Sequence, residues 1–394
     1  MPRRSRAGTT LAAAAAILVA VVTLVVVGSS DGRPGATGGL HASPTTTPTM
    51  TPSGALFVPA PNAGAVRQLD DLRRAGRAAD ASLIQALIDT PSAVWFGGGA
   101  PDEVEAQVRA VVDRSGDAVP VLVAYNVPGR DCAQYSAGGA SDGDAYRAWI
   151  EGFASGVADR HVVVILEPDG LALQPGDCGQ PDAFDRTILI SAAVDVLRTA
   201  SPHAAVYLDA GHSAWHDVSD MSARLVRAGV NRASGFFLNA SNYQATPGLI
   251  RYGAAIARCI RQAAGTGGCD DGPAAPAPSA TGASPEADLA HFVIDTSRNG
   301  LGPWAAGTTY PDDQAWCNPP GRGLGLRPTL DTGVPLLDGY LWIKIPGESD
   351  GTCTRGATAG SIDPEWGLVD PAAGHWFPEQ ALELARLADP PLVR

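Results

Sequence analysis

The stretch VVVILEPDG at residues 162–170 decides the fold class of this chain. Its first five residues form an unbroken apolar run, which is typical of a strand buried on both faces of a sheet. Asp169 follows almost at once, so the strand delivers a carboxylic acid to its carboxyl end. Parallel α/β sheets and barrels present such strand ends on one face, where their active sites are built.

Short apolar runs alternate with amphipathic segments along the rest of the chain, as in βα units. Strands are predicted at residues 93–96, 119–124, 162–166, 204–208, 235–238, 292–294 and 340–343. Helices are predicted at residues 101–114, 142–158, 182–199, 217–228, 249–262 and 378–387, each of which begins near Asp or Pro. The pattern predicts an α/β fold with a parallel sheet or barrel of seven strands.

Composition excludes some classes of function. The formal net charge is -13, which argues against nucleic acid as a partner because a polyanion binder needs a basic face. Apolar residues make up 45% of the chain, enough for a large core. Without its ends the chain has roughly 340 residues, which suits one α/β barrel with insertions.

Residues 1–28 carry Arg3, Arg4 and Arg6 before a mostly apolar run. This pattern is typical of a secretory signal peptide or of a retained signal anchor, and either places the folded part outside the cytoplasm. Residues 29–54 are rich in Gly, Pro, Ser and Thr and are predicted to be a linker. Residues 55–394 are the predicted folded domain, and residues 270–284 a mobile surface insertion within it.

Six cysteines in an exported chain are most simply three disulfides. Cys259 and Cys269 flank a short loop and are expected to pair with each other. Spacing leaves the other pairs open. No two cysteines form a C-x-x-C motif, so neither a zinc site nor a redox site is expected.

Acidic residues follow several of the predicted strands. One carboxylic acid is needed to protonate the leaving oxygen of a glycosidic bond, together with a second group that acts as nucleophile or as base toward water. Crowding of acids raises the pKa of the least solvated one. A single strand-end Asp is more often a helix cap. Several acids occur together here with aromatic residues whose rings can stack on sugars, and this combination favours a carboxylate-lined sugar cleft. The acids are Asp131, Asp169, Asp209 and Asp350, and the aromatic residues are Trp95, Trp215 and Trp316.

Two short motifs point to other chemistries. Residues 347–351, GESDG, match the G-x-S-x-G pattern of serine hydrolases, with His375 and either Asp363 or Asp370 downstream. That motif requires a helix directly after Ser349, whereas the following residues are rich in Gly, Thr and Pro. The pair His212 and His216 lacks the Glu of an H-E-x-x-H metal site and no third ligand is obvious, so no metal or other cofactor is expected.

Seven stretches carry a resemblance to a known family. They are AYNVPGRDC (124–132), LEPD (166–169), YLDAGHSAW (207–215), FLNASN (237–242), IDTSRNG (294–300), WCNPP (316–320) and LWIKIPGESDG (341–351). In these stretches the chain resembles glycoside hydrolase family 6, the inverting β-1,4-glucanases and cellobiohydrolases. The resemblance implies a distorted parallel barrel of about seven strands, with the active site at their carboxyl ends and residues 55–394 as the catalytic domain.

The resemblance also implies roles for individual residues. Asp169 would be the general acid, and Asp131 would raise its pKa and relay a proton from the attacking water. Asp350 would be the catalytic base. The resemblance also implies that Tyr125 favours distortion of the sugar and that Ser136 lies near the path of the water. Asp209 would shape the charge around the acid.

Further positions match the family's substrate-binding residues. The residues expected to contact sugar are Trp95, His212, Trp215, Asn239, Asn242, Trp316, Lys344 and Glu348. The family's two disulfides match Cys132 with Cys178 and Cys317 with Cys353. The implied partner is a β-1,4-glucan polysaccharide or oligosaccharide, with membrane contact only through a retained anchor, and the implied location is extracellular.

The mode of attack depends on loops over the cleft. Only fourteen residues separate Asp131 from Tyr146, which resembles the open endoglucanase form. The segment at residues 351–375 is long, as in exo-acting members. One covering loop without the other predicts an endoglucanase, with an exo-acting cellobiohydrolase and an inactive glucan-binding wall protein as alternatives.

Overall fold

The computed structural model describes residues 51–179, 186–263, 269, 289–307, 309–312, 314–356 and 362–393. The predicted signal or anchor segment, nearly all of the linker and the insertion at 270–284 lie outside these residues. Across the described ranges, no helix combines the length and the apolar character that a bilayer crossing requires.

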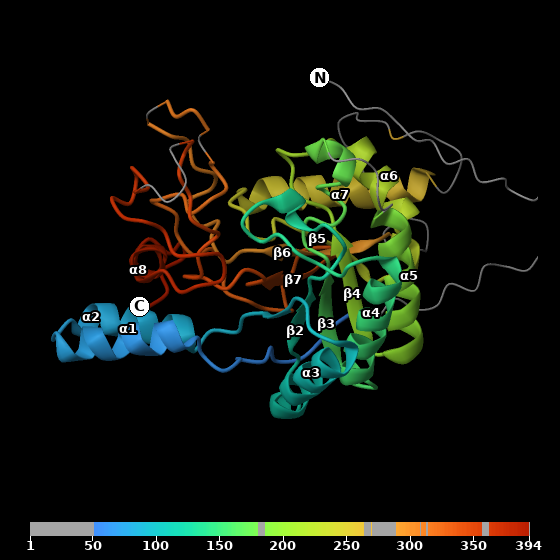
Figure 1. The fold of residues 1–394 in the computed structure, drawn as a ribbon, viewed down its shortest axis with the longest axis horizontal. Coiled ribbons are helices and arrows are strands. Elements are labelled where there is room, and N and C mark those ends of the chain that lie inside the picture. Colours follow the sequence, from blue (N-terminus) through green and yellow to red (C-terminus); the bar gives the residue numbers. More distant parts are fainter. Residues whose placement is uncertain are drawn as a thin grey trace, which may run out of the picture. The chain divides into compact units, whose positions relative to one another are not determined.

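Seven parallel strands form one sheet in sequential order, which confirms the predicted α/β fold (Figure 1). The strands are β1 Val94–Phe96, β2 Val121–Ala124, β3 Val162–Leu166, β4 Ala204–Asp209, β5 Gly235–Leu238, β6 His291–Asp295 and β7 Leu337–Leu341. The sheet curls into a partial barrel without a ladder between its two edge strands. At this seam the Ala93 N–H donates to the Trp342 carbonyl at 2.9 Å, and Trp95 Nε1 donates to the Ile343 carbonyl at 2.8 Å.

The end of β7 differs from the prediction of 340–343. The strand begins earlier, at Leu337, and ends at Leu341. Beyond this point the N–H groups of Ile343 and Lys344 donate to the Asp295 carboxylate at 3.2 and 3.0 Å. These two residues leave the ladder because a side chain at the end of the neighbouring strand takes their hydrogen bonds.

Helices cover the convex side of the sheet and form a separate group near its seam. They are α1 Ala63–Arg74, α2 Ala78–Ile88, α3 Pro101–Ser115, α4 Gly143–Val157, α5 Arg186–Ala200, α6 Val218–Arg227, α7 Thr246–Ala263 and α8 Pro378–Arg386, with short 3-10 helices at Asp131–Ala133, Pro175–Cys178 and Val230–Arg232. The six predicted helices are present within a few residues of their expected bounds. The first four residues of the one predicted at 182–199 fall among residues that are not described.

Sequence reasoning missed α1 and α2. In α1 the buried Leu69 and Leu72, and in α2 the buried Ala81, Ile84 and Leu87, recur at helical spacing, which was the available signal. Both helices pack with α8 into a small core of their own (Figure 1). The Asn62 side chain begins α1 by accepting a hydrogen bond from the Gly64 N–H at 2.7 Å.

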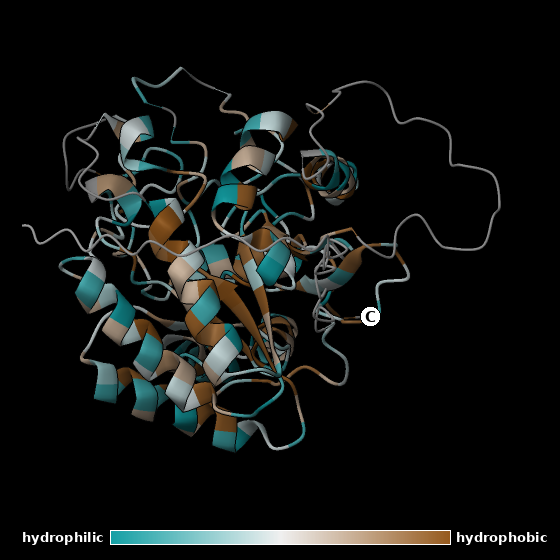
Figure 2. Ribbon diagram, turned by 90° about the vertical axis from the view of Figure 1, so that its right-hand side faces the viewer, coloured by the Kyte–Doolittle hydropathy of each residue, from teal (hydrophilic) through white to brown (hydrophobic). Residues whose placement is uncertain are grey.

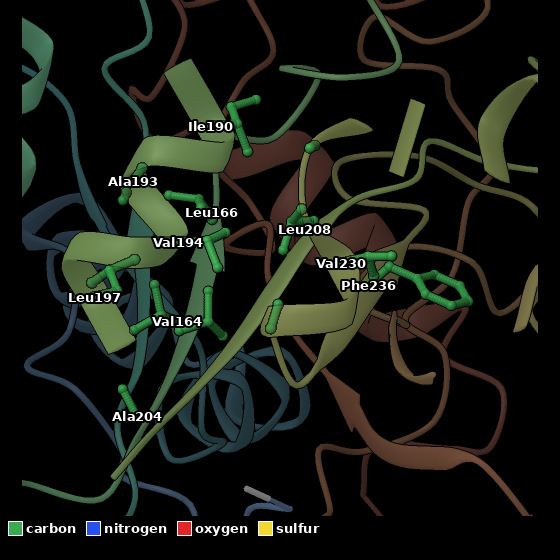
Figure 3. Close-up of a cluster of buried hydrophobic side chains, with 14 of the residues drawn as sticks. Val164, Leu166, Ile190, Ala193, Val194, Leu197, Ala204, Leu208, Val230 and Phe236 are labelled. Carbon is green, nitrogen blue, oxygen red and sulfur yellow. The ribbon is translucent and has the colours of Figure 1, made fainter. Parts of the chain in front are cut away.

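Two apolar layers hold the sheet in place. Alternate residues of each strand point outward against the helices, whereas the others fill the inside of the curl. Figure 2 shows the strands as almost wholly hydrophobic between helices with hydrophilic outer faces. In Figure 3, Ile190, Val194 and Leu197 of α5 lie against Val164 of β3 and Leu208 of β4. This packing fixes the strand ends, and therefore the residues that follow them.

Candidate active site

Buried carboxylates at the strand ends hold the neighbouring loops by their backbone N–H groups. The Asp209 carboxylate, at the end of β4, accepts hydrogen bonds from Leu171 and Ala172 after β3 at 3.1 and 2.8 Å, and from Gly211 at 3.0 Å. The Asp295 carboxylate, at the end of β6, accepts from Ser241 after β5 in addition to its two partners after β7. The rim of the sheet is therefore tied together by side chains from adjacent strands.

Glu167 performs this function for the loop after β2. Its carboxylate accepts hydrogen bonds from the backbone N–H of Asn126 at 3.0 and 2.9 Å and from that of Val127 at 2.9 Å. The side chain is fully buried, and burial raises its pKa to about 7 despite these donors. Sequence reasoning assigned no role to Glu167, although it lies two residues before Asp169 in the opening motif.

Asp169 is partly exposed at the centre of the rim. Burial of its carboxyl group raises its pKa well above the usual range, and the charges of Asp209 and Asp131 raise it further. The pKa of Asp209 is also raised by burial, but its three backbone N–H donors lower it again. Of these two coupled acids, Asp169 is therefore the one that retains a proton.

Asp131 begins the short 3-10 helix Asp131–Ala133 in the loop after β2. Its carboxylate accepts a hydrogen bond from the Ser136 N–H at 2.5 Å, and burial raises its pKa. The disulfide between Cys132 and Cys178 joins this loop to the one after β3. The loop that carries Asp131 is thus covalently held beside the loop that follows Asp169.

Tyr125 lies directly after β2 beneath these acids. Its ring is in edge contact with Trp95 at a centroid distance of 5.3 Å, and the Arg130 guanidinium lies 4.6 Å above it. Burial, followed by the charges of Asp169 and Asp131, raises the pKa of the Tyr125 hydroxyl well above its usual value. The hydroxyl therefore stays neutral and can only donate or accept a hydrogen bond.

Asp350 has the opposite electrostatic environment. Its carboxylate contacts Arg298 Nη1 at 2.7 Å and Lys344 Nζ at 3.4 Å, and it accepts from the Asn318 N–H at 3.0 Å and the Tyr243 hydroxyl at 3.3 Å. Burial would raise its pKa, but Arg298 and Lys344 outweigh burial and lower it. Asp350 is therefore an ionised carboxylate at neutral pH.

Sequence reasoning assigned no role to two of the groups that hold Asp350, Arg298 and Asn318. Arg298 is fully buried, and its guanidinium lies 4.5 Å above the Tyr243 ring. Asn318 accepts a hydrogen bond from the Asp350 N–H at 2.8 Å in return for the one that it donates to the carboxylate. Arg298 lies in the stretch IDTSRNG and Asn318 in WCNPP, but neither motif by itself indicates a contact with Asp350.

Non-glycine residues with left-handed backbone conformations gather at the site. Such conformations are unfavourable for these residues and recur where a fold positions functional groups. The residues with positive φ near the rim include Asp131 (58°), Cys132 (46°), Glu167 (54°), Asp169 (62°), Asn239 (69°), Ser241 (57°) and Asn318 (41°). The surrounding hydrogen bonds described above maintain these conformations.

Aromatic side chains lie on or near several of the loops at the rim. Trp95 is partly exposed, with its indole N–H bonded across the seam. His212 and Trp215 lie in the loop after β4 with ring centroids 5.5 Å apart, and Trp316, 38% exposed, lies 6.0 Å from the Tyr135 ring. Burial lowers the pKa of His212 to about 4, so the imidazole is neutral and can exchange hydrogen bonds with hydroxyl groups.

Some predicted sugar-binding residues form hydrogen bonds within the protein. The buried Asn239 donates to the carbonyls of Asp295 and Asn242 and accepts from the Gln244 N–H. Lys344 Nζ donates to the Ser349 carbonyl at 3.1 Å as well as contacting Asp350. These hydrogen bonds fix the position of both side chains at the rim.

Glu348 and Asn242 keep part of their polar surface available. The Glu348 carboxylate accepts a hydrogen bond from Asn62 Nδ2 at 2.8 Å, and burial raises its pKa. It lines a cavity of about 360 Å³ at the seam together with Trp95. Asn242 is partly exposed, and its side-chain oxygen accepts from the Tyr243 N–H at 2.9 Å.

The two alternative motifs do not form sites. Ser349 is fully buried and its hydroxyl donates to the Pro371 carbonyl at 2.7 Å, and in the described part of the chain the next helix begins at Pro378. His216 uses both ring nitrogens, one on the Ala172 carbonyl at 2.7 Å and one on Asp220 at 3.1 Å. Neither a nucleophilic serine nor a histidine metal pair is present at these positions.

The remaining two disulfides join Cys317 with Cys353 and Cys259 with Cys269, as the sequence and the resemblance predicted. The first links the segment that carries Asn318 to the loop after Asp350. The second lies at the end of α7, away from the rim.

Comparisons with known proteins agree with this geometry. A family model described as "Glycosyl hydrolases family 6" matches residues 52–388. Endoglucanase A of Thermobispora bispora is 38% identical over 76% of this chain and 56% of its own length, and endoglucanase A of Cellulomonas fimi is 39% identical over 80% and 58%. The chain thus spans little more than half of these relatives.

A solved structure is similar over a larger share. The endoglucanase Cel6 from Mycobacterium tuberculosis, in complex with methyl-cellobiosyl-4-deoxy-4-thio-beta-D-cellobioside, aligns with a TM-score of 0.67 and 36% identity. The alignment covers 86% of this chain and 99% of that one.

Proposed function

The chain belongs to family 6 of the glycosyl hydrolases, and from this we propose that it hydrolyses β-1,4-glucosidic bonds in cellulose or a related β-glucan. The reaction inverts the anomeric configuration and occurs at internal bonds of the polymer. The chain acts outside the cytoplasm, and three disulfides are compatible with that location. The signal peptide or anchor at residues 1–28 stays a prediction.

One observation carries this proposal: two acids on the same rim have pKa values shifted in opposite directions. Asp169 keeps its proton because burial, Asp209 and Asp131 raise its pKa, whereas Arg298 and Lys344 keep Asp350 ionised. An inverting glycosidase needs one protonated acid for the leaving oxygen and one carboxylate for the attacking water. Asp169 is the general acid and Asp350 the base in this assignment.

The neighbouring groups support the same step. Asp131 raises the pKa of the acid and relays a proton from the water, whose path passes Ser136. Asp209 concentrates negative charge beside the acid while holding the loop that follows it. The neutral Tyr125, held between Trp95 and Arg130, favours distortion of the sugar ring before cleavage.

Sugar units lie along the aromatic side chains in this proposal. Trp95, Trp215 and Trp316 stack on their apolar faces, while His212, Asn242 and Glu348 exchange hydrogen bonds with hydroxyl groups. Lys344 and Asn239 contribute indirectly, because the first contacts Asp350 and the second holds the loop after β5. Direct contact of Lys344 and Asn239 with sugar stays a prediction.

Internal cleavage is supported by the names of the relatives and by the short loop after Asp131. The loops that carry Asp131 and Asp350 are in contact, because Gly351 packs directly against the Tyr135 ring. A Cβ atom on Gly351 would lie only 2.4 Å from that ring. This contact favours partial covering of the cleft. The exo-acting alternative rests on the long segment at residues 351–375 and on this contact.

Proton NMR of fresh products from a soluble β-1,4-glucan tests the mechanism. Inversion requires newly formed reducing ends to appear first in the α configuration, before mutarotation. Early β product, or a trapped covalent glycosyl intermediate, would refute the assignment. Absence of any product while cellohexaose still binds in calorimetry would favour the inactive binding protein.

A further inference from the structure

Two aspartates are buried together in the loop that follows Asp350. Asp363 is 0% and Asp370 2% exposed, and oxygen atoms of the two carboxyl groups lie within 4.8 Å of each other. Neither residue has a role in the proposed reaction. Two negative charges at this separation inside a protein repel strongly.

Each carboxyl group has one oxygen in hydrogen bonds and one without any. Asp363 Oδ1 accepts from Arg355 Nε at 3.2 Å and from the Glu365 N–H at 2.8 Å, and Asp370 Oδ2 accepts from Asn318 Nδ2 at 2.8 Å. Asp363 Oδ2 lies 3.1 Å from Arg355 Nη2 as an ion-pair contact. Asp363 Oδ2 and Asp370 Oδ1 are buried and make no hydrogen bond among the described residues.

A proton on one of these two acids would satisfy both oxygens at once. Asp363 forms an ion pair with the Arg355 guanidinium, whereas the side-chain hydrogen bond that Asp370 accepts comes from the uncharged Asn318. We propose that Asp370 is a neutral acid whose O–H donates to Asp363 Oδ2, and that this acid–carboxylate pair positions Asp350 through Asn318. Only the catalytic part of this inference, the positioning of Asp350 as base, rests on the proposed function.

The charged and titratable groups around Asp370 agree with this assignment. From its own loop Asp363 and Arg355 face it, from the preceding segment Asn318, and from α8 the uncharged Gln380, which donates to Asn318 at 3.4 Å. The nearby Cys353 does not titrate because it is disulfide-bonded. Burial, with Asp363 adding to it, raises the pKa of Asp370 to about 7.

Asn318 transmits the state of this pair to Asp350. It accepts from the Asp350 N–H at 2.8 Å and donates its own N–H to the carboxylate at 3.0 Å, while its Nδ2 reaches Asp370. Ionisation of Asp370 places a second negative charge beside Asp363 and strains this arrangement. The pair therefore holds the proposed base in place at acidic and neutral pH and releases it as the pH rises.

The stability of Asp370→Asn tests the shared proton. The amide can donate to Asp363 and accept from Asn318 as the neutral acid does, but it cannot ionise. The melting temperature of the wild-type protein should fall at least about 2 °C more than that of the variant between about pH 6 and pH 8.5. The exposed Asp331→Asn serves as control and should follow the wild type. Parallel curves for wild type and D370N would overturn the proposal.

Activity tests the link to Asp350. Asp370→Ala should lower kcat on a soluble β-glucan by about tenfold, with KM within about twofold, whereas D370N should retain the wild-type kcat near pH 6. Equal losses in D370A and D370N, or no loss in either, would overturn the positioning role. If the wild type cleaves no β-glucan, the proposed function fails, yet the melting curves still decide whether the proton is shared.

Discussion

At the scale of the residue, Asp169 differs from the acids around it because it holds a proton and does not hold a neighbouring loop by its backbone N–H groups. Asp209, Asp295 and Glu167 each accept backbone N–H groups from a neighbouring strand end. A strand-end acid can thus be either structural or catalytic, and the sequence treats both alike.

Replacing Asp169 with Ala should abolish hydrolysis of unactivated β-glucan, with a fall in kcat of about 10²-fold or more, because the leaving oxygen is no longer protonated. Binding of cellohexaose should stay measurable by calorimetry. The exposed Asp144→Asn is a suitable control. Near-normal turnover of D169A on cellulose would contradict the role of Asp169.

Glu167 should matter for stability as much as for activity. Glu167→Ala leaves the N–H groups of Asn126 and Val127 buried without an acceptor, which should cost about 2–4 kcal/mol in the free energy of unfolding. Glu167→Gln retains one acceptor oxygen and should lose less. Equal urea midpoints for the alanine variant and the wild type would show that Glu167 does not hold the loop.

At the scale of the element, the loops are held by their disulfides as well as by the rim acids. The Cys132–Cys178 bridge closes a sequence separation of 46 residues and fixes the loop of Asp131. The Cys259–Cys269 bridge closes a separation of 10 residues at the end of α7.

Replacing Cys132 and Cys178 by Ser should lower the free energy of unfolding by about 2–4 kcal/mol and reduce kcat at a temperature where the variant is folded. The matched control, replacement of Cys259 and Cys269, should leave kcat unchanged. Denaturant titration and initial rates measure both effects. Equal kcat for the two double variants would mean that the first bridge does not position Asp131.

At the scale of the whole molecule, buried acids with raised pKa values make stability depend on pH. Burial raises the pKa of Glu167 from 4.5, and that of Asp370 from 3.8, to about 7 in each case. The folded protein keeps these protons up to about pH 7, whereas the unfolded chain releases them near pH 4. His291, whose pKa is raised by its hydrogen bond to Asp338, adds stability that is likewise lost as pH rises.

The free energy of unfolding should therefore be larger near about pH 5 than near about pH 8. Asp350 acts in the opposite sense, because its lowered pKa means that its contribution is lost as pH falls below about 3.8. Urea titrations at constant ionic strength measure the difference. A protein that is more stable at the higher pH would contradict the protonated state of the buried acids.

Internal cleavage is also a property of the whole cleft. An endoglucanase should reduce the viscosity of soluble carboxymethyl cellulose early, while few reducing ends have formed. Viscometry against a reducing-sugar assay on the same sample decides the mode of attack. A slow fall in viscosity together with abundant cellobiose would indicate exo action. The loops that touch at Tyr135 and Gly351 would then cover the cleft.

The sequence alone determined the α/β class, the approximate positions of the strands along the chain and the residues that follow them, because burial patterns and motifs are local properties of the chain. Strand-end positions such as Asp169 and Asp209 are therefore identifiable from the order of amino acids. The resemblance to the family added predicted roles for the acids and two predicted disulfide pairs, because these predictions rest on matched motifs.

Only the tertiary structure decided which of these acids keeps a proton and which one holds a loop. A pKa depends on burial and on neighbours from other strands, such as Arg298 and Lys344 around Asp350, and these meet only when the sheet curls. The use of Asn239 within the protein and the pairing of Asp363 with Asp370 have the same origin. Residues far apart in the chain form these contacts, and no local pattern records them.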